Sequence, residues 1–456
     1  MSLLAPLDPE QRAWRWRILI STYFAYAGFY LVRKVFNICK STLQKSVEDG
    51  GYGMSYTDVA DIGAAYLIFY MLGQFCCSFI GRKYGPRVII LGGLALSMAC
   101  NVVFGFANSY TTFLVFMAFN GLVQAAGWPG VVGGVAEWLR KHDRGTIMGI
   151  WSTNYVVGNI IVKWLGGMLL LHYSKTGLDA NGAQLYDWHL GVRYAFLGCT
   201  LLAFAIWWLV YFWQRNRPED VGLDPIVQPE DREDETVMAS NEERVTFREY
   251  LALLFNPIVP IMGACYFSIK FLRYALDSWL PTFLSLQGMD VASASFYSSI
   301  FDWTGLVGAI VAGYALDRWF KGRWDILCWL LGFGLIAGYY AVMQFGANPY
   351  LLAVSFGLVG FMLYGPDTLL CGAAAVIVAG ERNAVAVAGL VNGIGSIGPV
   401  VQELLIGRLL DSDTTAGALR STNILGLSMS VVYLVLMSII VLQVMLRNRR
   451  NKTTQT

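Results

Sequence analysis

The chain has 456 residues, of which 56% are hydrophobic and only 14% are charged. Soluble domains carry about 25% charged residues, so this composition excludes an ordinary soluble domain and indicates an integral membrane protein built of α-helices. The formal net charge of +2 combines 33 basic with 31 acidic residues. These charges are segregated along the chain, and their distribution is more informative than their sum.

Apolar windows of about twenty residues, each long enough to cross roughly 30 Å of hydrocarbon, predict twelve transmembrane helices. We expect them at about 17–38, 59–80, 87–107, 110–138, 145–171, 192–214, 257–285, 292–315, 325–345, 349–378, 383–408 and 422–446. Basic residues gather at alternate ends of these spans, from Arg12 near the N-terminus to Arg450 near the C-terminus. By the positive-inside rule, both termini are expected in the cytoplasm.

A long polar segment, residues 215–249, predicts a cytoplasmic linker between an N-terminal bundle (1–214) and a C-terminal bundle (250–456). Several charged residues and prolines of the first bundle have counterparts 235 to 240 residues later in the second. The corresponding pairs are Arg33 and Arg273, segments 82–87 and 317–323, Pro129 and Pro366, and Arg144 and Arg382. This spacing predicts a duplicated six-helix unit with pseudo-twofold symmetry. Binding sites in such folds lie near the midplane between the halves, where the two arginines are expected to face each other.

Arg33 and Arg273 are the leading candidates for ligand binding. An arginine within a bilayer is costly and usually faces the protein interior or a water-filled cavity. The guanidinium fork matches two oxygens of a phosphate or a carboxylate, and it stays charged at any relevant pH. Two such groups facing one cavity favour a dianion such as inorganic phosphate or a phosphate ester. The alternative is a structural ion pair, for which Asp277 lies one helical turn after Arg273.

Other polar residues within the spans are candidates for supporting roles. Lys34 points about 100° away from Arg33, so it either reaches the interface or supports the cavity from the side. Lys270 precedes Arg273 by one turn, on the same face. The tyrosines within the spans, which either donate to phosphate or sugar oxygens or simply pack, are Tyr26, Tyr30, Tyr70, Tyr155 and Tyr364.

Acidic residues within the spans support a rival hypothesis. A carboxylate in a low-dielectric cavity can take up and release a proton during transport, and Asp302 and Asp367 are placed for this. The preferred interpretation is that each neutralises a neighbouring cation or helps to switch conformations. Glu403 is expected close to an interface. The eight cysteines lie mostly in apolar stretches without CxxC pairing and are interpreted as packing residues, so we expect no metal site and no cofactor.

Several motifs resemble the major facilitator superfamily, and within it the organophosphate:phosphate antiporters. The superfamily resemblance rests on the spans, the duplication and the loop Asp317–Arg323. The antiporter resemblance rests on Tyr30–Lys34, Gly127–Pro129, Arg144–Trp151, Leu272–Pro281 and Tyr364–Pro366. This family includes glycerol-3-phosphate, hexose-phosphate and endoplasmic-reticulum glucose-6-phosphate transporters. The resemblance implies that Arg33 and Arg273 bind phosphate and that Tyr26, Tyr30, Tyr70 and Tyr364 line the cavity.

The sequence departs from the family pattern at four positions. Gln74 stands where the family has a cavity lysine, Tyr155 stands where the glycerol-phosphate members have a histidine, and Lys270 stands where a tyrosine precedes the second arginine. Arg82 replaces an acid in the loop after the second span. One positive group has thus moved from the first half to the second. Gating by Arg82, Asp317, Arg318 and Arg323 is therefore expected to differ between the halves.

The sequence therefore predicts a transporter and not an enzyme. The expected activity is alternating-access exchange of a hexose phosphate or glycerol-3-phosphate for inorganic phosphate. Two alternatives stay open, a proton-coupled organic-anion transporter and a transporter-like membrane sensor of hexose phosphate. The expected partners are these small phosphates and the lipid bilayer, with no nucleic acid, and the chain is expected to work as a monomer. A bacterial inner membrane is preferred to the endoplasmic reticulum.

Overall fold

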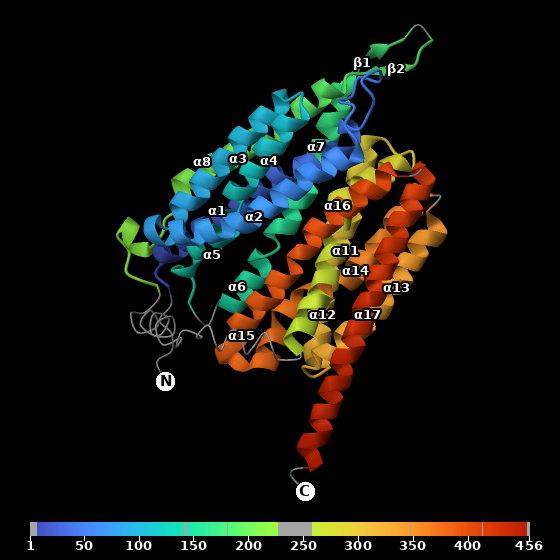
Figure 1. Cartoon of the computed structure of the whole chain (residues 1–456). Coiled ribbons are helices and arrows are strands. Elements are labelled where there is room, and N and C mark those ends of the chain that lie inside the picture. The colour runs from blue at the N-terminus through green and yellow to red at the C-terminus, as the bar shows by residue number, and fades with distance from the viewer. Residues whose placement is uncertain are drawn as a thin grey trace. The chain divides into compact units, whose positions relative to one another are not determined.

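The computed structural model describes residues 7–140, 144–179, 181–226, 258–346, 348–412 and 414–453 (Figure 1). Its contacts divide the chain into two compact units. Unit 1 comprises Met1–Met54 and Ala65–Asn241, and unit 2 comprises Ser55–Ala64 and Glu242–Thr456. The chain passes from one unit to the other within the predicted linker 215–249, most of which lies outside the described residues.

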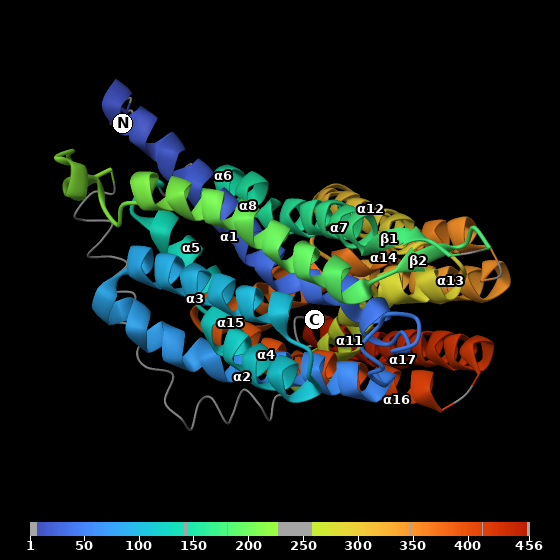
Figure 2. The ribbon, with the colours of Figure 1, turned by 90° about the horizontal axis from the view of Figure 1, so that it is seen from above.

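Unit 1 is a helical bundle around α1. Its elements are α1 (Pro9–Leu43), most of α2 (Tyr56–Tyr84), α3 (Pro86–Phe106), α4 (Tyr110–Gln124), α5 (Gly127–Ala136), α6 (Arg144–Trp151), α7 (Asn154–Ser174), α8 (Trp188–Trp213) and a 3-10 turn (Pro218–Val221). α1 packs against α7, α8, α5 and α3 (Figure 2). At Gly158, α7 approaches α1 so closely that a Cβ atom would lie 2.8 Å from the Ala27 Cα and 2.9 Å from the Tyr30 Cβ. This glycine therefore brings α7 against the α1 turn that precedes Arg33.

A short hairpin that the sequence analysis did not predict follows α7. Strands β1 (Lys175–Leu178) and β2 (Gln184–Tyr186) pair antiparallel. The Asp179 side chain accepts hydrogen bonds from the backbone of Asn181 and Ala183 at 2.8 and 2.7 Å, which closes the turn.

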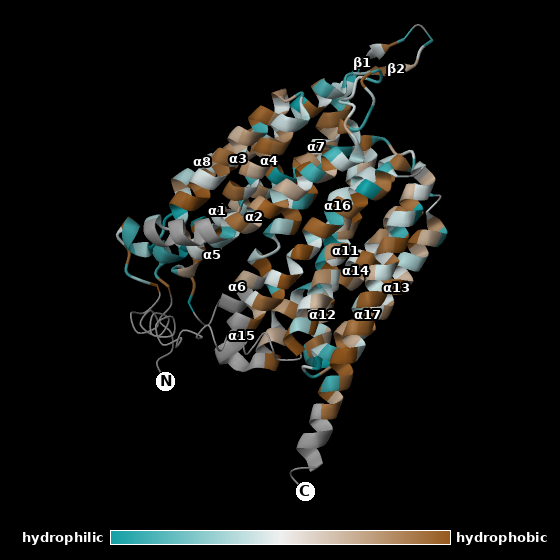
Figure 3. Cartoon of the chain, viewed as in Figure 1, coloured by the Kyte–Doolittle hydropathy of each residue, from teal (hydrophilic) through white to brown (hydrophobic). Residues whose placement is uncertain are grey.

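Unit 2 is a second helical bundle, organised around α11. Its helices are α11 (Ile258–Leu286), α12 (Val291–Arg318), α13 (Trp324–Phe345), α14 (Pro349–Cys371), α15 (Ala373–Gly395), α16 (Ile397–Asp411) and α17 (Thr415–Thr453). α11 packs against α12, α14, α15, α16 and α17, while α14 also packs against α12 and α13. Apolar residues dominate the helices (Figure 3), as expected where both the core and lipid are apolar.

Nine helical segments among the described residues are long and apolar enough to span a bilayer. The three other predicted spans correspond to α1, α2 and α11, which have 35, 29 and 29 residues. All three are long enough to cross, but α1 carries Arg33 and Lys34, and α11 carries Lys270, Arg273 and Asp277. The helices that depart most from an apolar span are therefore those that carry the candidate binding residues.

Several predicted spans are broken in the structure. The predicted helix 110–138 divides between α4 and α5, four residues before Pro129, and 383–408 divides between α15 and α16, three residues before Pro399. Proline has no N–H for the carbonyl four residues earlier and its ring clashes with that carbonyl, which explains both breaks. The span 145–171 divides between α6 and α7. The predicted connection around Glu381 and Arg382 is instead helical, within α15.

The first turns of α2 belong to unit 2, where α16 holds them. The Asp411 carboxylate accepts hydrogen bonds from the backbone N–H groups of Tyr56 and Thr57 at 2.9 and 2.7 Å. Ser55 and Asp58 complete the cap through reciprocal bonds of 3.0 Å. A carboxylate satisfies the free N–H groups and the partial positive charge of a helix N-terminus, so α16 fixes where α2 begins.

Candidate functional site

Arg33 lies in α1, in a setting made by aromatic rings. Its guanidinium carbon is 4.2 Å from the centroid of the Tyr30 ring and 5.8 Å from that of Tyr70. Its Nη1 donates to the Tyr66 hydroxyl at 3.4 Å, and its buried Nε has no hydrogen-bond partner in the described residues. No carboxylate in the described part of the chain pairs with it. Aromatic faces attract a cation without cancelling its charge, so Arg33 keeps both its charge and unused donors.

The tyrosines predicted around Arg33 are brought together, and the structure adds one that was missed. Tyr26 and Tyr30 pack edge to face with ring centroids 5.5 Å apart, and the Tyr155 ring of α7 lies 6.2 Å from Tyr30. On α2, Tyr66 stacks on Tyr70 at 5.8 Å. Tyr66 precedes Tyr70 by one helical turn, and this spacing was the available signal for placing it on the face of α2 toward Arg33.

Gln74, one turn beyond Tyr70, contributes to the local architecture. Its amide donates to the carbonyl of Ala125 at 3.5 Å. That carbonyl is the one left without its helical partner by Pro129, so Gln74 supports the α4–α5 break. This contact gives the polar side chain a structural reason to stand at a position where the family has a lysine.

Buried lysines in unit 1 extend the cationic character of α1. Lys34 is only 7% exposed, so its side chain is buried and does not reach out to an interface. Lys40 and Lys163, which were not candidate site residues, are also buried. A lysine inside the apolar run of α7 was a detectable signal, because such residues are rare in membrane spans.

Arg273 has a different environment from Arg33. Its Nη1 forms an ion pair with Oδ2 of Asp367 in α14, and its guanidinium carbon is 4.8 Å from the Tyr364 ring centroid. Asp367 and Tyr364 are three residues apart on α14, so one helix face supplies both contacts. The expectation that Asp367 neutralises a neighbouring cation is confirmed. The second oxygen of Asp367, Oδ1, is buried without a hydrogen-bond partner in the described residues.

Lys270, one turn before Arg273, has neutral partners among the described residues. Its Nζ donates to Oδ1 of Asn392 at 2.7 Å and to Oγ of Ser396 at 3.1 Å, and it lies 5.0 Å from the Tyr266 ring centroid. Asn392 lies in the last turn of α15 and Ser396 follows the end of that helix, and neither was predicted. Their oxygens are neutral, so no carboxylate in the described residues is paired with the Lys270 ammonium.

Two further acids that the sequence analysis singled out are buried in unit 2. Asp302 of α12 is 1% exposed. Glu403 of α16, expected near an interface, is also only 1% exposed, and its Oε2 accepts from Ser278, Trp279 and Gln402 at 3.0, 3.1 and 3.0 Å. Three donors satisfy this oxygen, so Glu403 ties α16 to α11 and does not lie at a polar surface.

The predicted gate residues lie at the end of α12 and the start of α13. Asp317 and Arg318 are exposed, whereas Arg323 donates Nε and Nη2 to the two carboxylate oxygens of Asp325 at 2.9 and 2.8 Å. The hydrogen bond from Arg323 to Asp325 raises the pKa of Arg323 above its ordinary value. The side chain of Arg82 lies outside the described residues.

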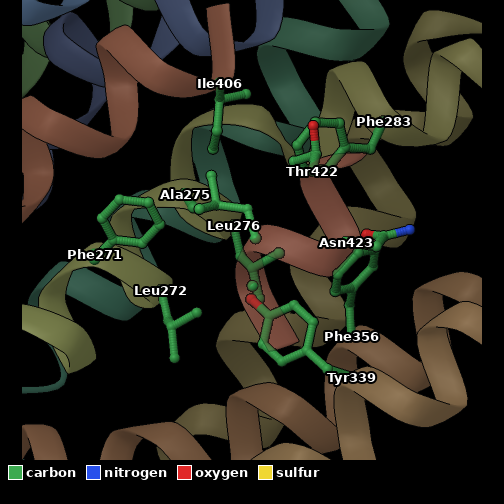
Figure 4. Close-up of a pocket in the computed structure, with 12 residues that line it drawn as sticks. Phe271, Leu272, Ala275, Leu276, Phe283, Tyr339, Phe356, Ile406, Thr422 and Asn423 are labelled. Atoms are coloured by element: carbon green, nitrogen blue, oxygen red, sulfur yellow. The ribbon is translucent and has the colours of Figure 1, made fainter. Parts of the chain in front are cut away.

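A small cavity and a surface groove among the described residues are lined by residues other than these arginines. The cavity in unit 2 has a volume of about 10 Å³ and lies between α11, α13, α14, α16 and α17 (Figure 4). Its walls include Phe271, Leu276 and Phe356, and it has room for about one water molecule. A groove of about 240 Å³ on unit 1 is lined by aromatic and aliphatic side chains, among them Trp16, Phe24 and Ile150. Neither is suited to binding a phosphate dianion.

Comparison with known proteins agrees with the membrane-protein fold. The chain is 28% identical over 404 residues to the glycerol-3-phosphate transporter of Bacillus subtilis, covering 86% of this chain and 85% of that protein. It is 27% identical over 376 residues to the membrane sensor protein UhpC of Salmonella typhimurium, covering 81% of this chain and 79% of that protein. These relatives match the antiporter family that the motifs resemble.

Solved structures agree on the fold. A crystal structure of a bacterial homolog of the human lysosomal transporter Spinster is 17% identical, with a TM-score of 0.68 and coverage of 95% of this chain and 96% of that one. The family model described as Major Facilitator Superfamily matches residues 22–403. The protein is therefore an integral, multi-pass α-helical membrane protein that belongs to the major facilitator superfamily.

Proposed function

We propose that this protein is an alternating-access antiporter that exchanges a phosphate ester, either a hexose phosphate or glycerol-3-phosphate, for inorganic phosphate. The observation that carries the proposal is the setting of Arg33. A half-buried guanidinium with aromatic neighbours is suited to an anionic ligand when its buried Nε has no hydrogen-bond partner and no carboxylate pairs with it in the described residues. The glycerol-3-phosphate transporter among its relatives supports phosphate as that anion.

Each arginine has its own role in this proposal. Arg33 of unit 1, with the rings of Tyr30 and Tyr70 and the hydroxyl of Tyr66 beside it, is proposed to bind phosphate, and so is Arg273 of unit 2. A guanidinium offers parallel N–H donors that match two phosphate oxygens, which a lysine cannot do. The supporting positions are Lys34, Tyr26, Gln74, Tyr155, Lys270, Tyr364 and Asp367.

Charge explains why the protein exchanges anions and does not release one without taking up another. The unloaded binding residues carry excess positive charge, which is costly to move through a low-dielectric environment. A phosphate group carries roughly −1.5 to −2 charges near pH 7 and cancels that excess. The conformational change then proceeds with either phosphate bound and is blocked without one.

Counterflow in reconstituted vesicles tests the proposal. Vesicles loaded with inorganic phosphate are expected to accumulate labelled phosphate through the wild-type protein. Arg33→Ala is expected to reduce this exchange by at least about 100-fold, because several charge-assisted hydrogen bonds are lost. Arg408→Ala is the matched control, since Arg408 is exposed and donates only to the Leu404 carbonyl at 3.1 Å. Unchanged exchange by Arg33→Ala would overturn the proposal.

The same vesicles separate the rival functions. A proton-coupled transporter would accumulate organic anions without internal phosphate and lose uptake when a protonophore is added. A sensor would bind phosphate esters without sustained turnover. Competition by a panel of phosphorylated sugars and glycerol-3-phosphate against labelled phosphate identifies the ester.

The proposed setting is a bacterial inner membrane, with both termini in the cytoplasm and a monomer as the working unit. The orientation rests on the basic residues at alternate span ends. Ser109 lies between α3 and α4, and Arg217 follows α8. The proposed orientation places these two residues on opposite sides of the membrane. Single cysteine substitutions at each, labelled from one side of sealed vesicles, test this orientation.

A further inference from the structure

Two arginine–aspartate pairs among the described residues of unit 2 differ in quality. Arg323 and Asp325 form a complete bidentate pair, with both carboxylate oxygens bonded, at 2.9 and 2.8 Å. Arg273 and Asp367 form a one-sided pair, in which only Oδ2 of the carboxylate is bonded. Bidentate pairing gains both energy and geometric specificity, so the Arg273–Asp367 pair is the more easily replaced of the two.

The unbonded oxygen of Asp367 is buried, which makes the pair costly to keep. Asp367 is 7% exposed, and its Oδ1 has no donor in the described residues. A buried acceptor without a donor loses its hydration and gains nothing in return. The pair therefore holds Arg273 in place and leaves one oxygen of Asp367 unsatisfied in the described residues.

The surroundings keep positive charge close to this pair. Lys270 is one turn from Arg273 and has only neutral hydrogen-bond partners in the described residues, Asn392 and Ser396. Tyr364 covers one face of the Arg273 guanidinium, with its ring centroid 4.8 Å away. When an anion takes the place of Asp367 on Arg273, the lysine remains to balance the added negative charge.

We propose that Asp367 is an internal counter-anion, which occupies the phosphate-binding edge of Arg273 until a phosphate group displaces it. This inference rests on the proposed function. When the protein's own carboxylate occupies the binding group in most molecules, only the remaining molecules can bind the ligand directly. The apparent affinity is then the intrinsic affinity multiplied by the fraction of molecules in which the binding group is unoccupied. Asp367 thereby sets how tightly phosphate binds and how readily it leaves.

The counter-anion also selects among ligands. A monoanionic carboxylate would only replace one carboxylate by another on Arg273, with no gain in charge. A phosphate group brings more negative charge and three terminal oxygens to the same fork. Asp367 therefore favours phosphates over small carboxylates, acting as a specificity-determining residue by competition.

Equilibrium binding of labelled inorganic phosphate to the purified full chain tests this role. Asp367→Asn keeps the size of the side chain and removes its charge, so phosphate is expected to bind on the order of tenfold more tightly. Acetate, which competes weakly in the wild type, is expected to compete more effectively in Asp367→Asn. Asp325→Asn is the matched control, because it removes the carboxylate of the other pair, and its affinity is expected to equal that of the wild type.

The outcomes separate this inference from the proposed function. Wild-type binding of phosphate with equal or weaker binding by Asp367→Asn overturns the counter-anion role alone. Absence of phosphate binding by the folded wild type overturns the proposed function and this inference with it. If Asp367→Asn does not fold, phosphate binding is measured on Asp367→Ser, which is also neutral and for which the same result is expected. Infrared difference spectra of the wild type provide an independent readout: phosphate is expected to shift the carboxylate bands, and spectra without such a shift contradict displacement.

Discussion

Arg33 and Arg273 lie 240 residues apart at corresponding places in the two sequence repeats, yet the structure gives them opposite surroundings. Arg33 lies among the rings of Tyr30 and Tyr70 and forms no ion pair in the described residues. Arg273 forms an ion pair with the carboxylate of Asp367 and lies beside the Tyr364 ring. A repeat thus preserves the position of a charge without preserving how that charge is balanced.

Because of this difference, the two arginines are expected to contribute differently to folding stability and to ligand binding. An arginine surrounded by aromatic rings keeps its charge for a ligand and supports its unit mainly by packing. An arginine paired with a buried carboxylate also keeps that carboxylate from being buried alone. Loss of Arg273 should therefore affect folding more than loss of Arg33, while loss of either affects binding.

The largest expected effect comes from Arg273→Ala, which leaves Asp367 buried and unpaired. Breaking a buried pair from one side costs about 3 kcal/mol or more, so the melting temperature of the purified protein should fall clearly. The double variant Arg273→Ala with Asp367→Asn should recover most of this loss, because no unpaired charge remains. Arg33→Ala should cost much less, since it leaves no carboxylate behind in the described residues.

The melting temperatures of the wild type, Arg273→Ala, the double variant and Arg33→Ala are measured in one detergent without phosphate. Equal melting temperatures for the single and double variants would show that Asp367 finds another partner when Arg273 is removed. The two arginines would then differ in the contacts that they make but not in what they contribute to the stability of the fold.

A smaller effect is expected for the ring beside Arg33. Tyr30→Leu removes a cation–π contact at 4.2 Å, worth about 0.5 to 2 kcal/mol, so phosphate should bind about tenfold more weakly. Tyr30→Phe keeps the ring and should stay within about threefold of the wild type. Labelled-phosphate binding measures both. Equal weakening by Phe and Leu would show that the hydroxyl, and not the ring, is what Arg33 requires.

The helices were predictable because the bilayer imposes a length on every span. Apolar windows located twelve spans, and the structure has helices at all of them. The breaks near Pro129 and Pro399 were not predicted, although proline chemistry explains them, because prolines such as Pro281 and Pro366 lie inside unbroken helices. Whether a proline divides a helix depends on neighbours such as Gln74, which satisfies the freed carbonyl of Ala125.

The candidate site was predictable in its charged residues and less so in their partners. Arg33, Lys270 and Arg273 stood out because charge is costly in an apolar span. The structure pairs Arg273 with Asp367, which is 94 residues away in the chain, whereas helical spacing alone points only to residues of the same helix such as Asp277. Local periodicity identifies residues on one helix face, but contacts between helices depend on how the helices pack.

The smallest expected effect is that of Tyr66→Phe, which removes the hydroxyl nearest to Arg33. The Nη1–Oη distance of 3.4 Å lies at the long end of hydrogen-bonding range, so the bond is weak. Phenylalanine keeps the stacked contact with Tyr70, where the ring centroids are 5.8 Å apart. Phosphate affinity is expected to change by about twofold, in the same binding assay. A tenfold loss would mean that the hydroxyl contacts the phosphate itself, and that Arg33 depends on a polar neighbour in binding as Arg273 does at rest.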